Sequence, residues 1–101
     1  MTVKEKRTSA VIQKFALGQV VATPGALKAF EDAGESPLPY LSRHSTGDWG
    51  ELCDEDKYEN DMSVTHDLRI LSAYKLSNGT KIWIITEADR SSTCILLPSE
   101  Y

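Results

Sequence analysis

Three residues of this chain have the types that metal-free phosphoryl transfer uses. His44 could exchange a proton with a 2′-hydroxyl of RNA, and Arg90 could stabilise the charge that develops on the phosphate. Thr93, or the nearby Ser91, could position the substrate. Small ribonucleases that use no metal divide the work in this way, so these residues indicate one candidate function, a ribonuclease-like toxin.

The same residues also have a structural interpretation. A single histidine near the end of a helix commonly binds the last carbonyl groups or solvent, and an arginine in a turn commonly pairs with a neighbouring carboxylate. On this interpretation His44 and Arg90 lie at the surface, and Arg90 pairs with Asp89 or Glu87. Because the spacing does not require catalysis, the sequence favours no catalytic residue.

Carboxylates are concentrated between residues 51 and 61, where they could in principle hold a hard cation. The stretch lacks the glycine and the closing glutamate that an EF-hand loop needs at fixed positions. We interpret it as the solvated face of a helix; a second interpretation is that it mimics a nucleic-acid backbone and occupies a DNA-binding partner. The acidic residues are Glu51, Asp54, Glu55, Asp56, Glu59 and Asp61.

Other metal and cofactor motifs are missing from the sequence. His44 and His66 each lack a second histidine, cysteine or glutamate at ligand spacing. The chain also contains no GxSxG elbow, Walker loop, GxGxxG fingerprint or HExxH helix. We therefore predict neither a metal site nor a cofactor.

The composition is typical of a single globular domain. The 101 residues are 41% hydrophobic and 26% charged, and a second core would leave each part with too little buried surface to fold. The net charge of −4 argues against a nucleic-acid-binding face, which is normally basic, so no direct DNA binding is expected. We predict a flexible tail over residues 1–14 and one domain over residues 15–101.

The compartment expected from the sequence is the cytoplasm. No apolar run approaches the roughly 20 residues of a membrane helix, and the N-terminus lacks the apolar segment of a signal peptide. Cys53 and Cys94 lie far apart and form no CxxC pair. We therefore interpret them as small hydrophobic side chains in a reducing compartment.

The N-terminal half predicts a short strand followed by helices. The strand covers residues 18–22 and ends where Thr23 and Pro24 begin a helix as N-cap and first helical residue, with Gly34 suited to the C-terminal end. A second, short helix is predicted with Ser36 as N-cap and Pro37 as its first residue.

A third helix is predicted from an apolar spacing near the acidic stretch. Trp49, Leu52 and Cys53 would form its buried side, with the carboxylates directed to solvent. The helix is expected to fray by Asn60, and residues 61–68 are expected to form a loop.

The C-terminal third predicts an antiparallel sheet of three strands, over residues 69–76, 81–88 and 93–97. Asn-Gly between the first two strands favours a two-residue type I′ turn, which would place Tyr74 opposite Trp83. The predicted fold class is therefore α+β: a short N-terminal strand, two to three helices, then a three-stranded antiparallel sheet with an Asn-Gly hairpin.

Three segments carry a resemblance to a known family. Residues 17–27 (LGQVVATPGAL), 47–50 (GDWG) and 81–91 (KIWIITEADRS) resemble small bacterial proteins of plasmids and integrated elements, often described as plasmid-related. The resemblance covers residues 15–101. The family is also described, from gene neighbourhood, as restriction-modification subunits, but a methyltransferase subunit needs a Rossmann-type domain that this chain is too short to contain.

The preferred hypothesis is a non-catalytic accessory or interaction protein of a mobile genetic element. The resemblance and the missing catalytic motifs favour one that counteracts a host defence by binding a protein. The predicted binding residues are Asp48, Trp49, Asp89 and Arg90, which lie in two of the resembling segments. The alternatives are the ribonuclease-like toxin described above and a small-molecule sensor with an aromatic pocket.

Overall fold

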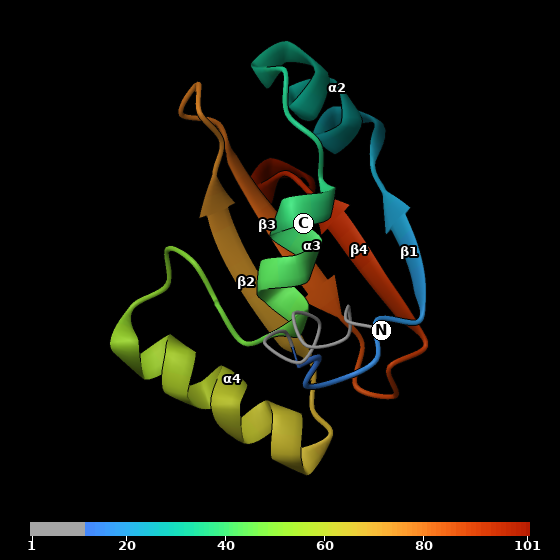
Figure 1. Ribbon diagram of the computed structural model, residues 1–101, viewed down its shortest axis with the longest axis vertical. Coiled ribbons are helices and arrows are strands. Elements are labelled where there is room, and N and C mark those ends of the chain that lie inside the picture. The colour runs from blue at the N-terminus through green and yellow to red at the C-terminus, as the bar shows by residue number, and fades with distance from the viewer. Residues whose placement is uncertain (1–11) are drawn as a thin grey trace, which may run out of the picture.

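The computed structural model describes residues 12–101, and most of the predicted tail, residues 1–11, lies outside the described residues. The fold class is α+β, as predicted: three α-helices and a four-stranded sheet (Figure 1). Among residues 12–101, no helix is both long and apolar enough to cross a bilayer. The elements in chain order are β1 (Gln19–Ala22), α2 (Pro24–Ala33), α3 (Leu38–Ser45), α4 (Asp54–His66), β2 (Ile70–Lys75), β3 (Lys81–Thr86), β4 (Ser92–Leu96) and the short 3₁₀ helix η1 (Pro98–Glu100).

The sheet is mixed, with the strand order β1-β4-β3-β2. β2, β3 and β4 pair antiparallel, whereas β1 pairs parallel to β4 and forms one edge of the sheet (Figure 1). The sheet therefore contains one strand more than the three predicted, because the residues of a strand indicate its extended conformation but not the partner with which it pairs.

The first helix agrees with its predicted signals. Thr23 Oγ1 accepts a hydrogen bond of 3.1 Å from the backbone N–H of Ala26, and Pro24 is the first helical residue. Gly34 follows the helix with a φ of 68°, the left-handed conformation expected at its end. α3 begins at Leu38 with Pro37 as N-cap, one residue later than predicted, and the Ser36 hydroxyl accepts a hydrogen bond from the backbone N–H of Leu38.

The third helix differs from the prediction. Helix α4 begins at Asp54 and continues to His66, so Trp49 and Leu52 precede it and most of the predicted loop is helical. Gly50 explains the late start, because its φ of 76° and its bridge to Ala73 on β2 are incompatible with a helix. Cys53 is the exposed N-cap residue rather than part of a buried side.

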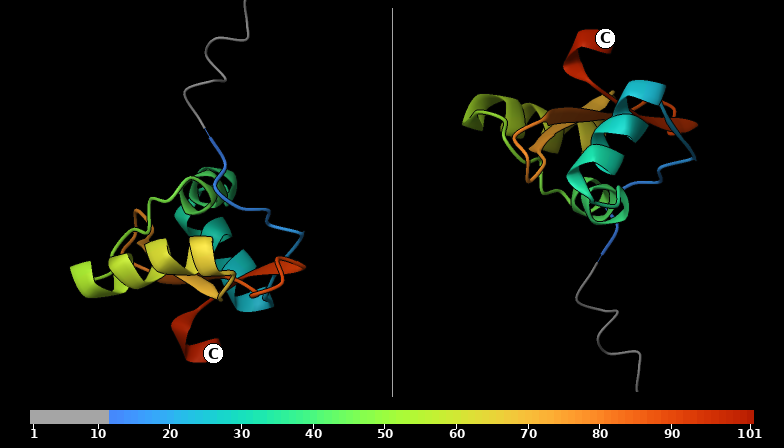
Figure 2. Two further views of the ribbon diagram at one scale, coloured as in Figure 1. Left: turned by 90° about the horizontal axis from the view of Figure 1, so that it is seen from below. Right: turned by 90° about the horizontal axis from the view of Figure 1, so that it is seen from above.

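The helices are distributed unevenly around the sheet. α2 and α3 cover one face together with the segment before β1, η1 lies on the opposite face, and α4 lies beside the β2 edge (Figure 2). The main core is enclosed between the covered face and its two helices. Its buried members are Ala26, Ala29, Phe30, Leu41, Tyr74, Leu76, Ile82, Ile84 and Ile95.

The connection between β2 and β3 contains three residues rather than two. The backbone N–H of Gly79 donates to Leu76 O at 2.9 Å, and the N–H of Leu76 donates to Thr80 O at 2.8 Å. Gly79 has a φ of 90°, whereas Asn78 is not among the residues with positive φ. This is the pattern of a type I turn followed by a glycine bulge. The extra residue shifts the register by one from the prediction, so Tyr74 pairs with Ile82.

Gly79→Val is expected to lower the free energy of unfolding by more than about 1 kcal/mol, because a β-branched residue is strained at positive φ. The position is open, with no heavy atom within 4 Å of an added Cβ, so the backbone conformation alone causes the loss. Urea unfolding followed by tryptophan fluorescence measures the loss, with Ser77→Val as a control two residues away in the same turn. Wild-type stability of Gly79→Val would contradict the turn described here.

Candidate functional site

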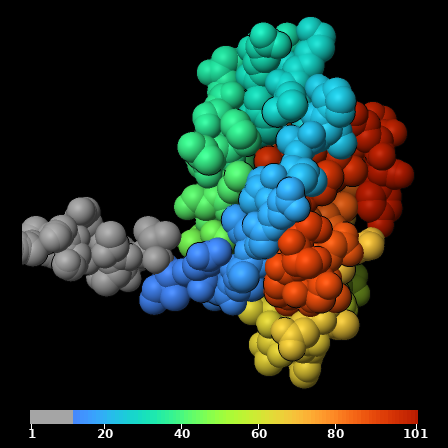
Figure 3. Space-filling view, turned by 90° about the vertical axis from the view of Figure 1, so that its right-hand side faces the viewer, coloured from blue at the N-terminus to red at the C-terminus, as the bar shows by residue number. Residues whose placement is uncertain are grey.

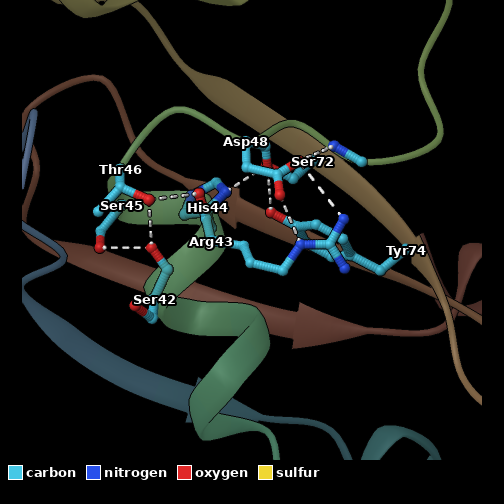
Figure 4. A network of polar contacts seen from close by, with 9 residues as sticks. Ser42, Arg43, His44, Ser45, Thr46, Asp48, Ser72 and Tyr74 are labelled. Atoms are coloured by element: carbon cyan, nitrogen blue, oxygen red, sulfur yellow. Dashed lines mark hydrogen bonds and ion pairs between the residues drawn. The ribbon is translucent and has the colours of Figure 1, made fainter. Parts of the chain in front are cut away.

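His44 lies in the core, near the C-terminal end of α3, and is 0% exposed. Its Nδ1 atom is 2.5 Å from the hydroxyl oxygen of Ser72 on β2, and its Nε2 atom is 2.9 Å from that of Thr86 on β3. Figure 4 shows the imidazole directed toward Ser72. The prediction of a surface histidine is therefore wrong, because the ring fills the interface between helix and sheet and satisfies two buried hydroxyl groups.

The hydrogen bonds around His44 form a chain in which each donor can be assigned. The Thr93 hydroxyl donates to the backbone carbonyl of Leu17 at 2.7 Å, so its oxygen must accept from Thr86, 2.7 Å away. Because the Thr86 hydroxyl donates its proton to Thr93, the Thr86 oxygen accepts a hydrogen bond from His44 Nε2–H. Nδ1 is left as the acceptor of the Ser72 hydroxyl proton. The chain thus selects the neutral Nε2–H tautomer, and burial lowers the pKa of His44 to about 3.

Two aromatic rings separate the imidazole from solvent. Phe15 packs edge-on against His44 with ring centroids 5.2 Å apart, and Trp49 does so at 6.0 Å. Phe15 is 8% exposed and Trp49 is 3% exposed. In this arrangement no substrate can reach the imidazole, and a general-base role would require the segment that carries Phe15 to move away.

Arg90 is occupied by backbone carbonyl groups. Its Nη1 donates to Leu68 O at 2.7 Å, Glu87 O at 3.1 Å and Ala88 O at 3.2 Å, and its Nη2 donates to Ser63 O at 2.9 Å. The residue adopts a φ of 61°. Arg90 therefore joins the β3–β4 turn to the end of α4, rather than pairing with a carboxylate as predicted.

The two carboxylates considered as partners of Arg90 have other roles. Asp89 accepts hydrogen bonds from the hydroxyl of Ser91 at 2.6 Å and from its backbone N–H at 3.0 Å, and these bonds lower the pKa of Asp89. Glu87 lies 3.4 Å from a guanidinium nitrogen of Arg69. Both contacts stabilise the turn and leave neither carboxylate near the Arg90 guanidinium nitrogens.

The structure brings the three candidate catalytic residues together only in part. His44 and Thr93 are linked through Thr86, all three fully buried. Arg90 lies outside this chain, with its guanidinium carbon 5.5 Å from the centroid of the Phe15 ring. Because Phe15 separates Arg90 from the imidazole, the three side chains do not share an open surface.

The predicted binding residues Asp48 and Trp49 also make internal contacts. Asp48 accepts from Arg43 Nε at 2.7 Å, which lowers the pKa of Asp48, and Arg43 lies 4.7 Å above the Tyr74 ring (Figure 4). The Tyr74 hydroxyl donates to the Asp48 carbonyl at 2.6 Å. Trp49 Nε1–H donates to Asp61 at 2.9 Å. Asp48 and Trp49 thus connect α3, β2 and α4.

The sequence reasoning missed Ser72 and Thr86, which complete the contacts of His44. A signal for both was available, because they occupy the same alternating positions as the buried residues Ile70 and Ile84 on their strands. A polar residue at such a position requires a buried partner. His44 is the residue that supplies it.

The outward side of α4 is exposed and carries two large apolar side chains. The side toward the body contains the buried Asn60 and Ser63. On the opposite side Tyr58 is 62% exposed and Met62, one helical turn later, is 39% exposed. Exposed carboxylates surround them. We call this surface the α4 outer face, formed by Asp54, Glu55, Tyr58, Glu59 and Met62.

Neither metal chemistry nor a relative identifies the function. Within the part of the chain that the structure describes, no group of three or more His, Cys, Asp or Glu side chains is placed to hold a metal ion. Comparisons with protein-family models, curated proteins and solved structures found no match. The function is therefore argued from the arrangement of the residues.

Proposed function

We propose that this protein is a non-catalytic interaction protein of a mobile genetic element, which acts in the cytoplasm and counteracts a host defence by binding a protein. The α4 outer face supports the binding role. It presents an aromatic and a thioether side chain, Tyr58 and Met62, with 62% and 39% exposure, on a helix whose other side is attached to the sheet. Exposed aromatic residues and methionine are typical of protein interfaces.

The α4 outer face also indicates the chemistry of the partner. Asp54, Glu55 and Glu59 surround the two apolar side chains and are exposed. A matching surface would offer a shallow apolar pocket for Tyr58, bordered by lysine or arginine side chains. A basic, nucleic-acid-binding protein of the host has this chemistry, and the acidic helix would occupy its groove. The mobile-element origin rests on the resemblance of residues 17–27, 47–50 and 81–91.

The ribonuclease alternative has less support. It needs His44 in contact with RNA, but His44 is 0% exposed beneath Phe15 and Trp49. It also needs a free guanidinium group, whereas Arg90 donates to four backbone carbonyls. The binding function requires neither of these residues to be accessible.

The experiment is affinity capture from a host-cell lysate with tagged wild-type protein and two variants of the α4 outer face. Tyr58→Ala removes the central aromatic group, and Glu55→Lys reverses the charge beside it. We expect each to weaken capture of a basic protein at least about tenfold, as loss of an interface hot spot does. Capture by the wild type should also weaken at high salt, because opposite charges attract across the contact.

Two matched controls distinguish this face from exposed surface in general. Leu38→Ala removes an apolar side chain that is 70% exposed on α3, and Glu31→Lys reverses an exposed charge on α2. Both should capture the same protein as the wild type. The proposal fails if the α4 variants capture the same proteins as the controls.

A further inference from the structure

The two edges of the sheet differ in how their backbone groups are satisfied. At the β2 edge, the Asn60 side chain donates to Leu71 O at 2.7 Å and accepts from Leu71 N at 3.3 Å. Ala73 donates its N–H to Trp49 O at 3.2 Å and accepts from Glu51 N at 2.6 Å. This edge is therefore closed to further strands at Leu71 and Ala73.

The β1 edge is open. The backbone N–H of Gln19 donates to Ser91 O, and that of Thr23 donates to Ile95 O, each at 3.0 Å. Because a parallel ladder uses alternate residues, Gln19, Val21 and Thr23 face β4. Val20 and Ala22 then direct N–H and C=O away from the sheet, and no partner for these groups occurs among residues 12–101.

Among residues 12–101, the feature of β1 that normally discourages pairing is its length of only four residues. Edge strands are commonly guarded by lysine, proline or a covering segment. Val20 is 42% exposed and Val21 is 44% exposed, and the segment of residues 12–22 lies uncovered across this side of the molecule (Figure 3). Residues 15–27 contain no charged side chain, and the Glu100 carboxylate, which accepts from the Thr23 hydroxyl, lies at the end of the strand rather than beside Val21. Copies of a protein with a net charge of −4 can therefore meet at Val21 without like charges in contact.

From these observations we infer that β1 pairs antiparallel with β1 of a second copy, around a two-fold axis that passes beside Val21. In this register the N–H of Val20 donates to the C=O of Ala22 in the second copy, and the N–H of that Ala22 donates back to Val20. The two-fold axis repeats both bonds, and Val21 faces Val21 of the second copy. The contact is self-complementary, as a two-fold interface requires.

An open, shallow hollow of about 550 Å³, lined by residues 13–18 and Val20, lies beside the β1 edge. In the register above, Pro24 of the second copy, the first residue of its α2, lies opposite Gly18 at the border of this hollow. Because the strand is only four residues long, the contact buries less surface than a stable interface, which buries about 800 Å² on each partner. We expect a weak dimer, with a dissociation constant on the order of 100 µM.

Sedimentation equilibrium of the full chain tests this inference, from micromolar to millimolar concentration. The mass should rise from 11.2 kDa toward twice that value. Val21→Lys places two positive charges directly opposite each other and should abolish the rise. Val20→Pro removes only a donor that faces away from β4, so it should abolish the rise while keeping the β1–β4 ladder.

Leu38→Lys is the matched control, because it introduces the same charge at an apolar residue that is 70% exposed on α3, away from β1. This variant should dimerise like the wild type. If the mass of the wild type stays at 11.2 kDa up to roughly 1 mM, the inference is overturned. The open edge would then be a site for a strand of another protein. Dimers that persist in both β1 variants overturn it as well. The result is independent of the α4 outer face, which lies on a different element.

Discussion

Gly50→Ala is expected to lower the free energy of unfolding by about 3 kcal/mol or more, one of the two largest effects expected here. Gly50 adopts a φ of 76° and forms a bridge with Ala73. An added Cβ would lie 2.0 Å from the Ala73 carbonyl oxygen and 2.6 Å from Cδ1 of Tyr74. A backbone carbonyl cannot turn aside as a flexible side chain can. The substitution must therefore separate the Trp49–Glu51 segment from the β2 edge.

Gly34→Ala is the matched control for Gly50→Ala. Gly34 has a similar φ of 68°, but no heavy atom lies within 4 Å of an added Cβ. Gly34→Ala should lower the free energy of unfolding by only about 1 kcal/mol, because it adds the strain of a left-handed backbone and no steric clash. Urea unfolding of both variants, followed by circular dichroism, measures the difference. Equal losses would show that the close approach of Gly50 to β2 does not contribute.

The second large effect is a loss of stability in mild acid caused by His44. Burial lowers the pKa of His44 from 6.5 to about 3, so the unfolded chain binds a proton at a pH where the folded protein does not. Full stability is therefore present above pH 6.5, and it falls as the pH decreases toward about 3. The slope is about 1.4 kcal/mol per pH unit, or about 2 kcal/mol between pH 6.5 and 5.

The pH range above 5 isolates the histidine from the carboxylates. Glu35, Asp48, Asp89 and Glu100 also have lowered pKa values because each accepts hydrogen bonds. Their ordinary pKa values are 3.8 to 4.5, so the stabilisation that they contribute is present above about pH 5 and is lost only at lower pH.

Urea unfolding at several pH values between 5 and 7.5 measures the contribution of His44. His44→Gln keeps a donor and an acceptor without a titrating ring, so its overall stability should fall while its pH dependence in this range disappears. His66→Gln changes the other histidine, which is exposed on α4, and should retain the slope. A wild-type stability that is flat from pH 5 to 7.5 would contradict the buried neutral imidazole.

Some residues of the candidate site could be predicted from the sequence, but their role could not. The sequence indicates His44 and Thr93 as candidate catalytic residues, and they do belong to one hydrogen-bonded chain. Their role differs because Ser72, Thr86 and Phe15, which are distant in sequence, remove the imidazole from solvent. The sequence indicates Arg90 as a candidate phosphate ligand, yet its guanidinium group donates to carbonyl groups at the end of α4 and in its own turn.

Elements whose signals are local can be predicted from the sequence alone. Thr23, Pro24 and Gly34 mark α2 because capping involves residues within one or two turns of the helix. The three C-terminal strands follow from their β-branched and aromatic residues. Three other features arise only in the folded chain: β1 pairs parallel to β4, α4 starts after the bridge between Gly50 and β2, and His44 is buried. Each depends on contacts between residues far apart in the chain, and local propensity carries no information about such contacts.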